Sequence, residues 1–299
     1  MFATVTLGDG RSLEYVELGD PSGRPVLFCH GTPATGGQAA VVADAARDHG
    51  VRLLAPSRPG YGDSTASAPG LASFAADALE LADLVGLDRF TTMGLSGGGP
   101  FALAVAAVAP ERVTSVAVQG GTAAYFEVMP PSDEDAAERR AIAMFVAGDR
   151  DGAVAEMTRS AEADFGELRA LSEDEFAATM RAQAPPNESW LASRPDAYAA
   201  FLTDFRRAIA GSAGYVRDTL SWGAAWDVDL AAVTAPVHLA YGDSDRMVPR
   251  EHGDWLLERL PGAGRVLVPG GHGDATFGQC EETFRRIAAS PGQADHPAR

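Results

Sequence analysis

Residues 90–100 read Phe90-Thr91-Thr92-Met93-Gly94-Leu95-Ser96-Gly97-Gly98-Gly99-Pro100. A short apolar run thus leads into a glycine-flanked serine, and an alanine-rich run, 100–109, follows it. This pattern predicts a sharp turn from a strand into a helix, which strains the serine backbone and lifts its hydroxyl clear of the sheet. Only very small neighbours fit such a turn, and glycines supply the room. With 33 glycines in the chain the motif alone also fits an ordinary turn, so the assignment of Ser96 as a nucleophile depends on its partners.

A serine hydroxyl needs a histidine base, itself oriented by a carboxylate, to attack at neutral pH. Among the six histidines, His272 directly follows the β-rich run 265–268, in the flexible stretch Pro269-Gly270-Gly271-His272-Gly273. A loop at that place can aim an imidazole across the top of a sheet, so we predict that His272 is the base. Four other histidines are interpreted as structural or solvated: His49, His238, His252 and His296.

The orienting acid is expected at the end of another strand. Two carboxylates, Asp243 and Asp245, follow the apolar run 237–241. We assign Asp245 as the acid, because Asp243 is better placed to hold the turn as an Asx-type residue. The end of the run after the nucleophile helix, Val118-Gln119-Gly120-Gly121, offers no carboxylate that would compete.

An acyl-transfer site also needs two N–H groups that stabilise the developing oxyanion. Gly97, directly after the nucleophile, is predicted to supply one. The other is expected from the loop His30-Gly31-Thr32-Pro33, and Thr32 is preferred over Gly31 because Pro33 has no N–H. His30 is interpreted as a residue that holds this loop by hydrogen bonds, and a role as a second base is the alternative.

With these motifs the chain resembles the α/β-hydrolase superfamily, whose order of nucleophile, acid and base is that of Ser96, Asp245 and His272. The resemblance extends over nearly the whole length. Its five motifs, in order, are His30-Gly31, Arg58-Pro59-Gly60-Tyr61-Gly62-Asp63-Ser64, the elbow at 94–98, Gly242-x-x-Asp245-x-x-Val248-Pro249 and Gly270-Gly271-His272. The resemblance implies an α/β fold with a mostly parallel sheet flanked by helices and an inserted helical cap.

Several branches of the superfamily fit less well. Ser96 stands where haloalkane dehalogenases and epoxide hydrolases have aspartate and dienelactone hydrolases have cysteine. Proline iminopeptidases carry tryptophan at the position of Gly97 and a second glycine at that of Thr32, and cofactor-free haloperoxidases usually have methionine in place of Gly97.

Periodicity independently predicts the same architecture. Residues 2–7 and 13–18 flank Gly8-Asp9-Gly10 as a hairpin. Continuous apolar runs, typical of a parallel sheet buried on both faces, occur at 26–29, 52–55, 90–93, 114–118, 237–241 and 265–268. The clearest helix spans 71–85, with an apolar face interpreted as core and Asp77, Glu80 and Asp83 on the opposite, polar face.

The interval 122–227 breaks the alternation of strands and helices and is rich in alanine, glutamate and arginine. We predict a helical cap there, a hydrolase core formed by 1–121 and 228–289, and a disordered tail at 290–299. Aromatic residues of the cap are expected to form its own small core for the most part. Those nearest its two junctions, predicted to line the substrate pocket, are Tyr125, Phe126, Trp222 and Trp226.

Composition limits the other functions. A net charge of -17 disfavours nucleic acid or an anionic membrane surface as a partner. All 24 basic residues are arginines, which excludes lysine Schiff-base chemistry, pyridoxal phosphate attachment and a P-loop, and suggests a GC-rich bacterium. Cys29 and Cys280 fit buried thiols in a reducing compartment. No signal peptide is evident, and we expect a cytoplasmic protein that is a monomer or a homodimer. No metal or cofactor is implied, because His and Cys lack ligand spacing.

The sequence thus predicts a serine hydrolase that cleaves an ester, thioester or lactone of a small apolar molecule. One alternative is a tailoring enzyme of secondary metabolism that uses the same triad for C–C cleavage, cyclisation or elimination. A second is a small-molecule receptor on this scaffold that has lost turnover.

Overall fold

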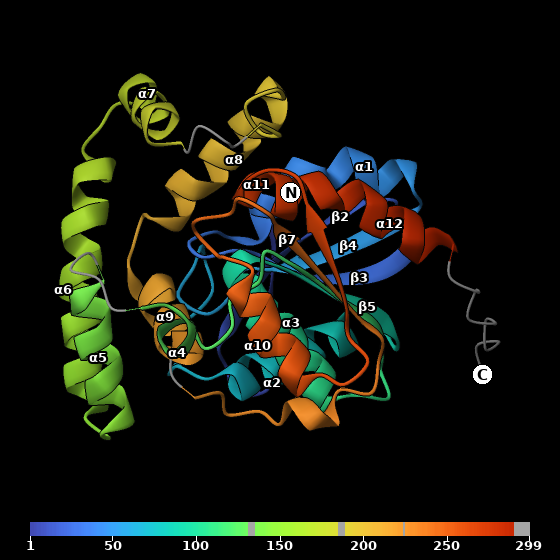
Figure 1. Cartoon of the computed structure of the whole chain (residues 1–299), viewed down its shortest axis with the longest axis horizontal. Helices are drawn as coiled ribbons and strands as arrows, with labels where there is room; N and C mark the ends of the chain where they lie inside the picture. Colours follow the sequence, from blue (N-terminus) through green and yellow to red (C-terminus); the bar gives the residue numbers. More distant parts are fainter. Residues whose placement is uncertain (131–134, 185–188, 224, 290–299) are drawn as a thin grey trace.

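The computed structural model describes residues 1–130, 135–184, 189–223 and 225–289 and is built around one eight-stranded sheet (Figure 1). The strands lie in the order β1-β2-β4-β3-β5-β6-β7-β8. Strands β1 and β2 form the predicted hairpin, β2 pairs antiparallel with β4, and all later pairs are parallel. The strands are β1 Ala3–Thr6, β2 Ser12–Gly19, β3 Arg24–Cys29, β4 Val51–Pro56, β5 Phe90–Leu95, β6 Val113–Gln119, β7 Val237–Gly242 and β8 Gly264–Val268.

Successive residues of a strand point to opposite faces of the sheet, and helices cover both faces. On β3, Leu27 and Cys29 face a core formed with α2 and α3, whereas Val26 and Phe28 face a second core formed with α1 and α12. Figure 1 shows α2, α3 and α10 on one side and α1, α11 and α12 on the other. Their bounds are α1 Ala43–Asp48, α2 Leu71–Leu84, α3 Gly99–Val108, α10 Glu251–Arg259, α11 His272–Thr276 and α12 Cys280–Ala289.

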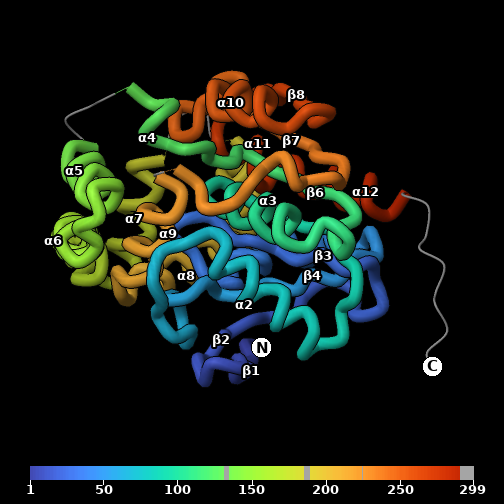
Figure 2. Tube along the Cα trace, turned by 90° about the horizontal axis from the view of Figure 1, so that it is seen from below, coloured from blue at the N-terminus to red at the C-terminus, as the bar shows by residue number. Residues whose placement is uncertain are grey.

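Between β6 and β7 the described residues form helices and contain no strand, and we call the helices of residues 125–223 the helical insertion. Its long helices lie together at one side of the core, as Figures 1 and 2 show. Its members are α4 Tyr125–Val128, α5 Ala136–Val146, α6 Arg150–Arg169, α7 Glu173–Gln183, α8 Pro195–Ala208 and α9 Ala213–Gly223.

Buried polar contacts fasten α8 to the core. The Arg207 guanidinium donates to buried Glu14 of β2 at 2.7 Å, and Asp204 accepts both the backbone N–H of Thr35, at 3.0 Å, and the Thr35 hydroxyl. Burial raises the pKa of Asp204 to about 6, with the two Thr35 donors and Arg207 opposing that shift. These contacts hold α8 against β2 and the loop that follows β3.

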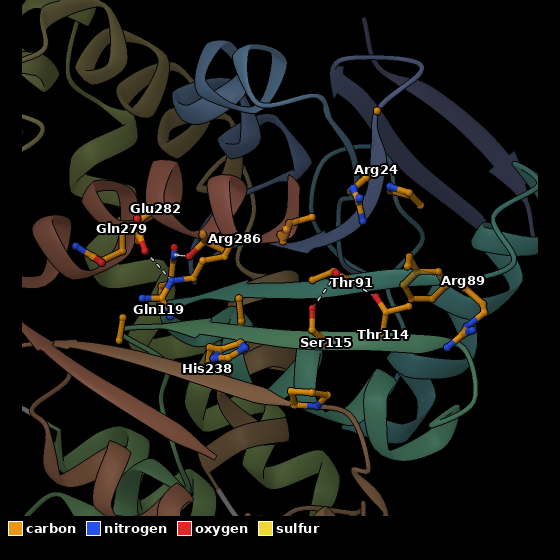
Figure 3. Close-up of a pocket in the computed structure, with 18 of the residues that line it drawn as sticks. Arg24, Arg89, Thr91, Thr114, Ser115, Gln119, His238, Gln279, Glu282 and Arg286 are labelled. Carbon is orange, nitrogen blue, oxygen red and sulfur yellow. Dashed lines mark hydrogen bonds and ion pairs between the residues drawn. The ribbon is translucent and has the colours of Figure 1, made fainter. Parts of the chain in front are cut away.

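Two predictions about burial were wrong. The parallel sheet is not covered on both faces at the β7–β8 edge, where His238 and Val266 are exposed. A groove of about 1400 Å³ extends from there along the sheet, lined by residues such as Thr91 of β5, Ser115 of β6 and Arg286 of α12 (Figure 3). Asp77 of α2 is buried rather than solvated, because it pairs with Arg11 from the hairpin at 2.5 Å. The predicted disordered tail, 290–299, lies outside the described residues.

Candidate active site

Ser96 lies in the sharp turn between β5 and α3 that the sequence predicts. Its φ of 52° makes it the one non-glycine residue with positive φ among the described residues. Such backbone is strained for a residue with a side chain, and strain of this kind is typical of functional sites. The flanking glycines are required by space: a Cβ on Gly94 would lie 2.4 Å from the carbonyl oxygen of Gly98, and one on Gly98 would lie 2.1 Å from that of Cys29.

The structure brings His272 and Asp245 together. Nδ1 of His272, at the start of α11, lies 2.7 Å from Oδ2 of Asp245, whose side chain is fully buried. The other carboxylate oxygen, Oδ1, accepts the backbone N–H groups of Met247 at 2.8 Å and Val248 at 2.9 Å. The carboxylate is therefore fixed by its own loop, and its hydrogen bond with the imidazole orients the ring.

Asp243 has a different function from Asp245. Its Oδ1 accepts the backbone N–H of Gly270 at 3.1 Å, so it ties the loop after β7 to the loop that carries His272. The Asx-type contact predicted for Asp243 is instead made by Asp245, which accepts the N–H two residues further on. Of the two candidate acids, the structure places only Asp245 against the imidazole.

The sheet brings these loops to one edge. Parallel strands β5, β6, β7 and β8 are neighbours, and ligand sites of such sheets lie beyond the carboxyl ends of the strands. The loop after β6 contacts both halves of the site: the backbone N–H of Thr122 donates to the Ser96 carbonyl at 3.2 Å, and Gly120 is so close to the His272 ring that a Cβ would lie 3.0 Å from Cε1. Ser96 and His272 therefore flank the same loop.

Thr32 and Gly97, the predicted oxyanion donors, are neighbours. A Cβ on Gly97 would lie 2.5 Å from the Thr32 hydroxyl oxygen and 3.4 Å from the Thr32 backbone nitrogen. The adjacent His30 is fully buried and holds the loop, with Nδ1 2.7 Å from the Gly31 carbonyl and Nε2 accepting the Arg58 backbone N–H at 3.0 Å. These two contacts agree with a structural function for His30, whose pKa burial lowers well below the usual value for histidine.

The sequence of the chain matches the family of the alpha/beta hydrolase fold over residues 24–278. The chain belongs to this family. Shorter matches include the non-heme chloroperoxidase of Streptomyces lividans, 34% identical over 113 residues, and haloalkane dehalogenase 2 of Mycobacterium tuberculosis, 36% identical over 115 residues. Each covers 37% of this chain, and the matches span only 41% and 38% of those two relatives. The fold is similar to that of the esterase EaEST from Exiguobacterium antarcticum, with a TM-score of 0.66 and 20% identity over 97% of this chain and 100% of that one.

In this alpha/beta hydrolase, His252 of α10 is fully buried, which agrees with the structural one of the two interpretations that the sequence offers for it. Its Nδ1 accepts the backbone N–H of Ala123 at 3.1 Å, and its ring stacks on Tyr125. Burial lowers the pKa of His252 to about 4, against the opposing charge of Asp245. His252 therefore stays neutral at physiological pH.

Three of the four predicted pocket aromatics form one cluster near His252. Tyr125 meets both Phe126, at 5.1 Å between ring centroids, and Trp222, at 5.7 Å. Trp226 lies apart from Tyr125 against Trp255 of α10, although its indole N–H donates to the Trp222 carbonyl. Of these four aromatic residues, Tyr125 is the one stacked on His252.

Sequence reasoning missed a buried ion pair beneath the Thr32 loop. Arg58, directly after β4, donates to Asp218 of α9 at 2.6 Å, and both side chains are fully buried. Arg58 is part of a motif that the sequence analysis quoted, but Asp218 has no local signal because its partner is 160 residues away.

Cys29 and Cys280 are both buried and free, as their surroundings in the sequence predict. Within the described ranges, no group of histidine, cysteine, aspartate and glutamate residues has the arrangement of a metal site. None of the helices that the structure describes is long and apolar enough to cross a membrane.

Proposed function

We propose that the protein is a serine hydrolase that cleaves an ester, thioester or lactone of a small apolar molecule through an acyl-enzyme intermediate. The observation that carries the proposal is the contact of His272 Nδ1 with buried Asp245 at 2.7 Å, beside the strained turn that holds Ser96. A carboxylate that accepts the Nδ1 proton leaves Nε2 of the imidazole free to act as a base.

The proposed reaction follows from this arrangement. The Ser96 oxygen attacks the substrate carbonyl while His272 takes the serine proton, and the carbonyl oxygen becomes an oxyanion that the N–H groups of Thr32 and Gly97 stabilise. His272 then gives its proton to the leaving alcohol, thiol or ring oxygen as the carbon bond to that atom breaks. Water, deprotonated by His272, attacks the acyl group and releases the acid and Ser96.

The helical insertion is proposed to act as the cap of the site, with the cap spanning residues 122–227 as the sequence suggests. The aromatic cluster of Tyr125, Phe126 and Trp222 supports an apolar substrate, because such side chains dominate small-molecule pockets. The fastening of α8 and α9 to the core by buried polar pairs supports a cap whose position is fixed on that side.

Dehalogenation is not favoured despite the partial match to a haloalkane dehalogenase. Serine displacing a halide would leave an ether on the enzyme, and water would not readily cleave it, whereas an acyl ester is open to attack at its carbonyl. Ser96 therefore supports acyl transfer.

The test is steady-state hydrolysis of p-nitrophenyl esters graded from acetate to decanoate, with the wild type, Ser96→Ala and His272→Gln. We expect the wild type to turn over esters of at least one acyl length and both variants to lose kcat by about 10⁴-fold or more. An inactive wild type across esters, thioesters and lactones, or a Ser96→Ala variant as active as the wild type, would overturn the proposal.

A further inference from the structure

A buried ion pair joins the helical insertion to the loop that carries Thr32. Arg58 Nε lies 3.0 Å from both carboxylate oxygens of Asp218, and Nη2 lies 2.6 Å from Oδ2. Both side chains are fully buried. Such a pair adds little to the stability of a protein compared with apolar residues of the same shape. Its main effect is therefore expected on the groups that it orients.

The guanidinium of Arg58 is hydrogen-bonded to three successive residues of the loop. It donates to the carbonyl of His30 at 2.5 Å, to the carbonyl of Gly31 at 2.8 Å and to the hydroxyl of Thr32 at 3.0 Å. An arginine fork is planar and rigid, so donors on one guanidinium fix the acceptors relative to one another. The orientation of Arg58 therefore sets the backbone of residues 30–32.

Asp218 in turn sets the orientation of Arg58 and also accepts the Thr32 hydroxyl at 2.8 Å. A second buried arginine, Arg217, has its Nη1 3.9 Å from the same carboxylate. Without the charge of Asp218, two buried guanidinium groups would face each other with no counter-charge between them. Their repulsion would move Arg58 off the three loop acceptors.

We propose that Asp218 of α9 is a positioning residue for the oxyanion hole, acting through Arg58 and Thr32. The helical insertion thereby aligns the Thr32 N–H with the oxyanion, besides forming the cap. This inference rests on the proposed serine hydrolase function.

The test compares Asp218→Asn with Glu14→Gln in the full chain. Asparagine keeps the shape of Asp218 and removes its charge. Glu14 is the matched control, because it is a fully buried carboxylate that pairs with an arginine of the insertion, Arg207, and has no hydrogen bond or ion pair with residues 30–32. Folded active sites are counted by labelling with a fluorophosphonate to completion, and kcat and KM are measured on a p-nitrophenyl ester.

We expect Asp218→Asn to lower kcat per labelled site by about 10²-fold, the cost of a lost oxyanion donor, with KM within about threefold. Phenylboronic acid, which adds to the serine oxygen and places a boron-bound oxygen where the oxyanion forms, should bind about 10²-fold more weakly. Binding of the carboxylic acid product should stay unchanged. Glu14→Gln should lower thermal stability and leave kcat per labelled site and the boronate affinity unchanged.

A kcat per labelled site and a boronate affinity equal to those of Glu14→Gln would overturn the inference and leave the serine hydrolase intact. Failure of the wild type to be labelled or to hydrolyse esters would instead remove the proposed function itself. If Asp218→Asn does not fold, Thr32→Val decides: it keeps the backbone N–H and removes the hydroxyl bonded to Arg58 and Asp218. We expect a lower kcat at unchanged KM, and an unchanged kcat would refute the positioning function.

Discussion

Replacing Asp245 with asparagine is expected to disable the site through the tautomer of His272. In the structure, Oδ1 of Asp245 accepts two backbone N–H groups, from Met247 and Val248. The amide of asparagine must keep its oxygen on those donors, because an NH₂ group facing them would be repelled. Its NH₂ group therefore faces His272 Nδ1, where Oδ2 now lies at 2.7 Å.

An NH₂ donor at that place favours the imidazole with an unprotonated Nδ1 and a protonated Nε2. Nε2 then has no lone pair with which to accept the Ser96 proton. Loss of the orienting carboxylate in a triad of this type lowers kcat by about 10⁴-fold, which is about 5.4 kcal/mol of transition-state stabilisation.

Asp243→Asn is the matched control. Asparagine can still accept the Gly270 N–H at the position where Oδ1 now accepts it, at 3.1 Å, so we expect kcat to fall by less than about tenfold. The assay is kcat and KM on a p-nitrophenyl ester at pH 8, with thermal unfolding to show that both variants fold. Equal losses, or a larger loss for Asp243→Asn, would refute the assignment of the acid.

Two further substitutions test other parts of the site, and a third tests the contact that fastens α8 to the core. Gly97→Ala is expected to lower kcat by about 10- to 100-fold, because its Cβ would lie 2.5 Å from the Thr32 hydroxyl; unchanged kinetics would contradict the oxyanion assignment. Burial raises the pKa of Asp204 to about 6 from the usual 3.8 of an aspartate, so its ionisation should reduce the free energy of unfolding by about 2–3 kcal/mol as pH rises from 4 to 7. Urea titrations should show that Asp204→Asn lacks this component, and parallel pH profiles for the two proteins would disprove the shift. Trp222→Ala should shift the preferred acyl length or raise KM, while labelling of Ser96 by a small probe survives. Because the indole is buried, the substitution should also lower the free energy of unfolding by about 3–5 kcal/mol. A proportional loss of kcat/KM on every ester, with labelling abolished, would show that Trp222 supports the core.

Much of the fold could be predicted because its signals are local. The inner strands are short, mostly apolar runs, and the strand, the glycine-flanked Ser96 and the helix after it are consecutive in the sequence. The pairing of His272 with Asp245 was predictable for a related reason, because both follow strands of one parallel sheet and such strands end at the same edge.

What could not be predicted depends on contacts between distant segments. Arg11 of the hairpin buries Asp77, a residue that looks solvated within its own helix. An apolar run also does not indicate whether a helix will cover it, so the exposed face at His238 had no signal. Asp218 lies in α9 of the insertion, and only the folded chain shows that its partner is Arg58.

The central claim is that Ser96 is the covalent nucleophile. The most direct measurement is reaction of the wild type with a fluorophosphonate, followed by intact-mass determination and peptide mapping of the adduct. The account predicts a single adduct, located on Ser96, and none on the Ser96→Ala variant under the same conditions. An adduct on another residue of the wild type, or labelling that persists in Ser96→Ala, would contradict it.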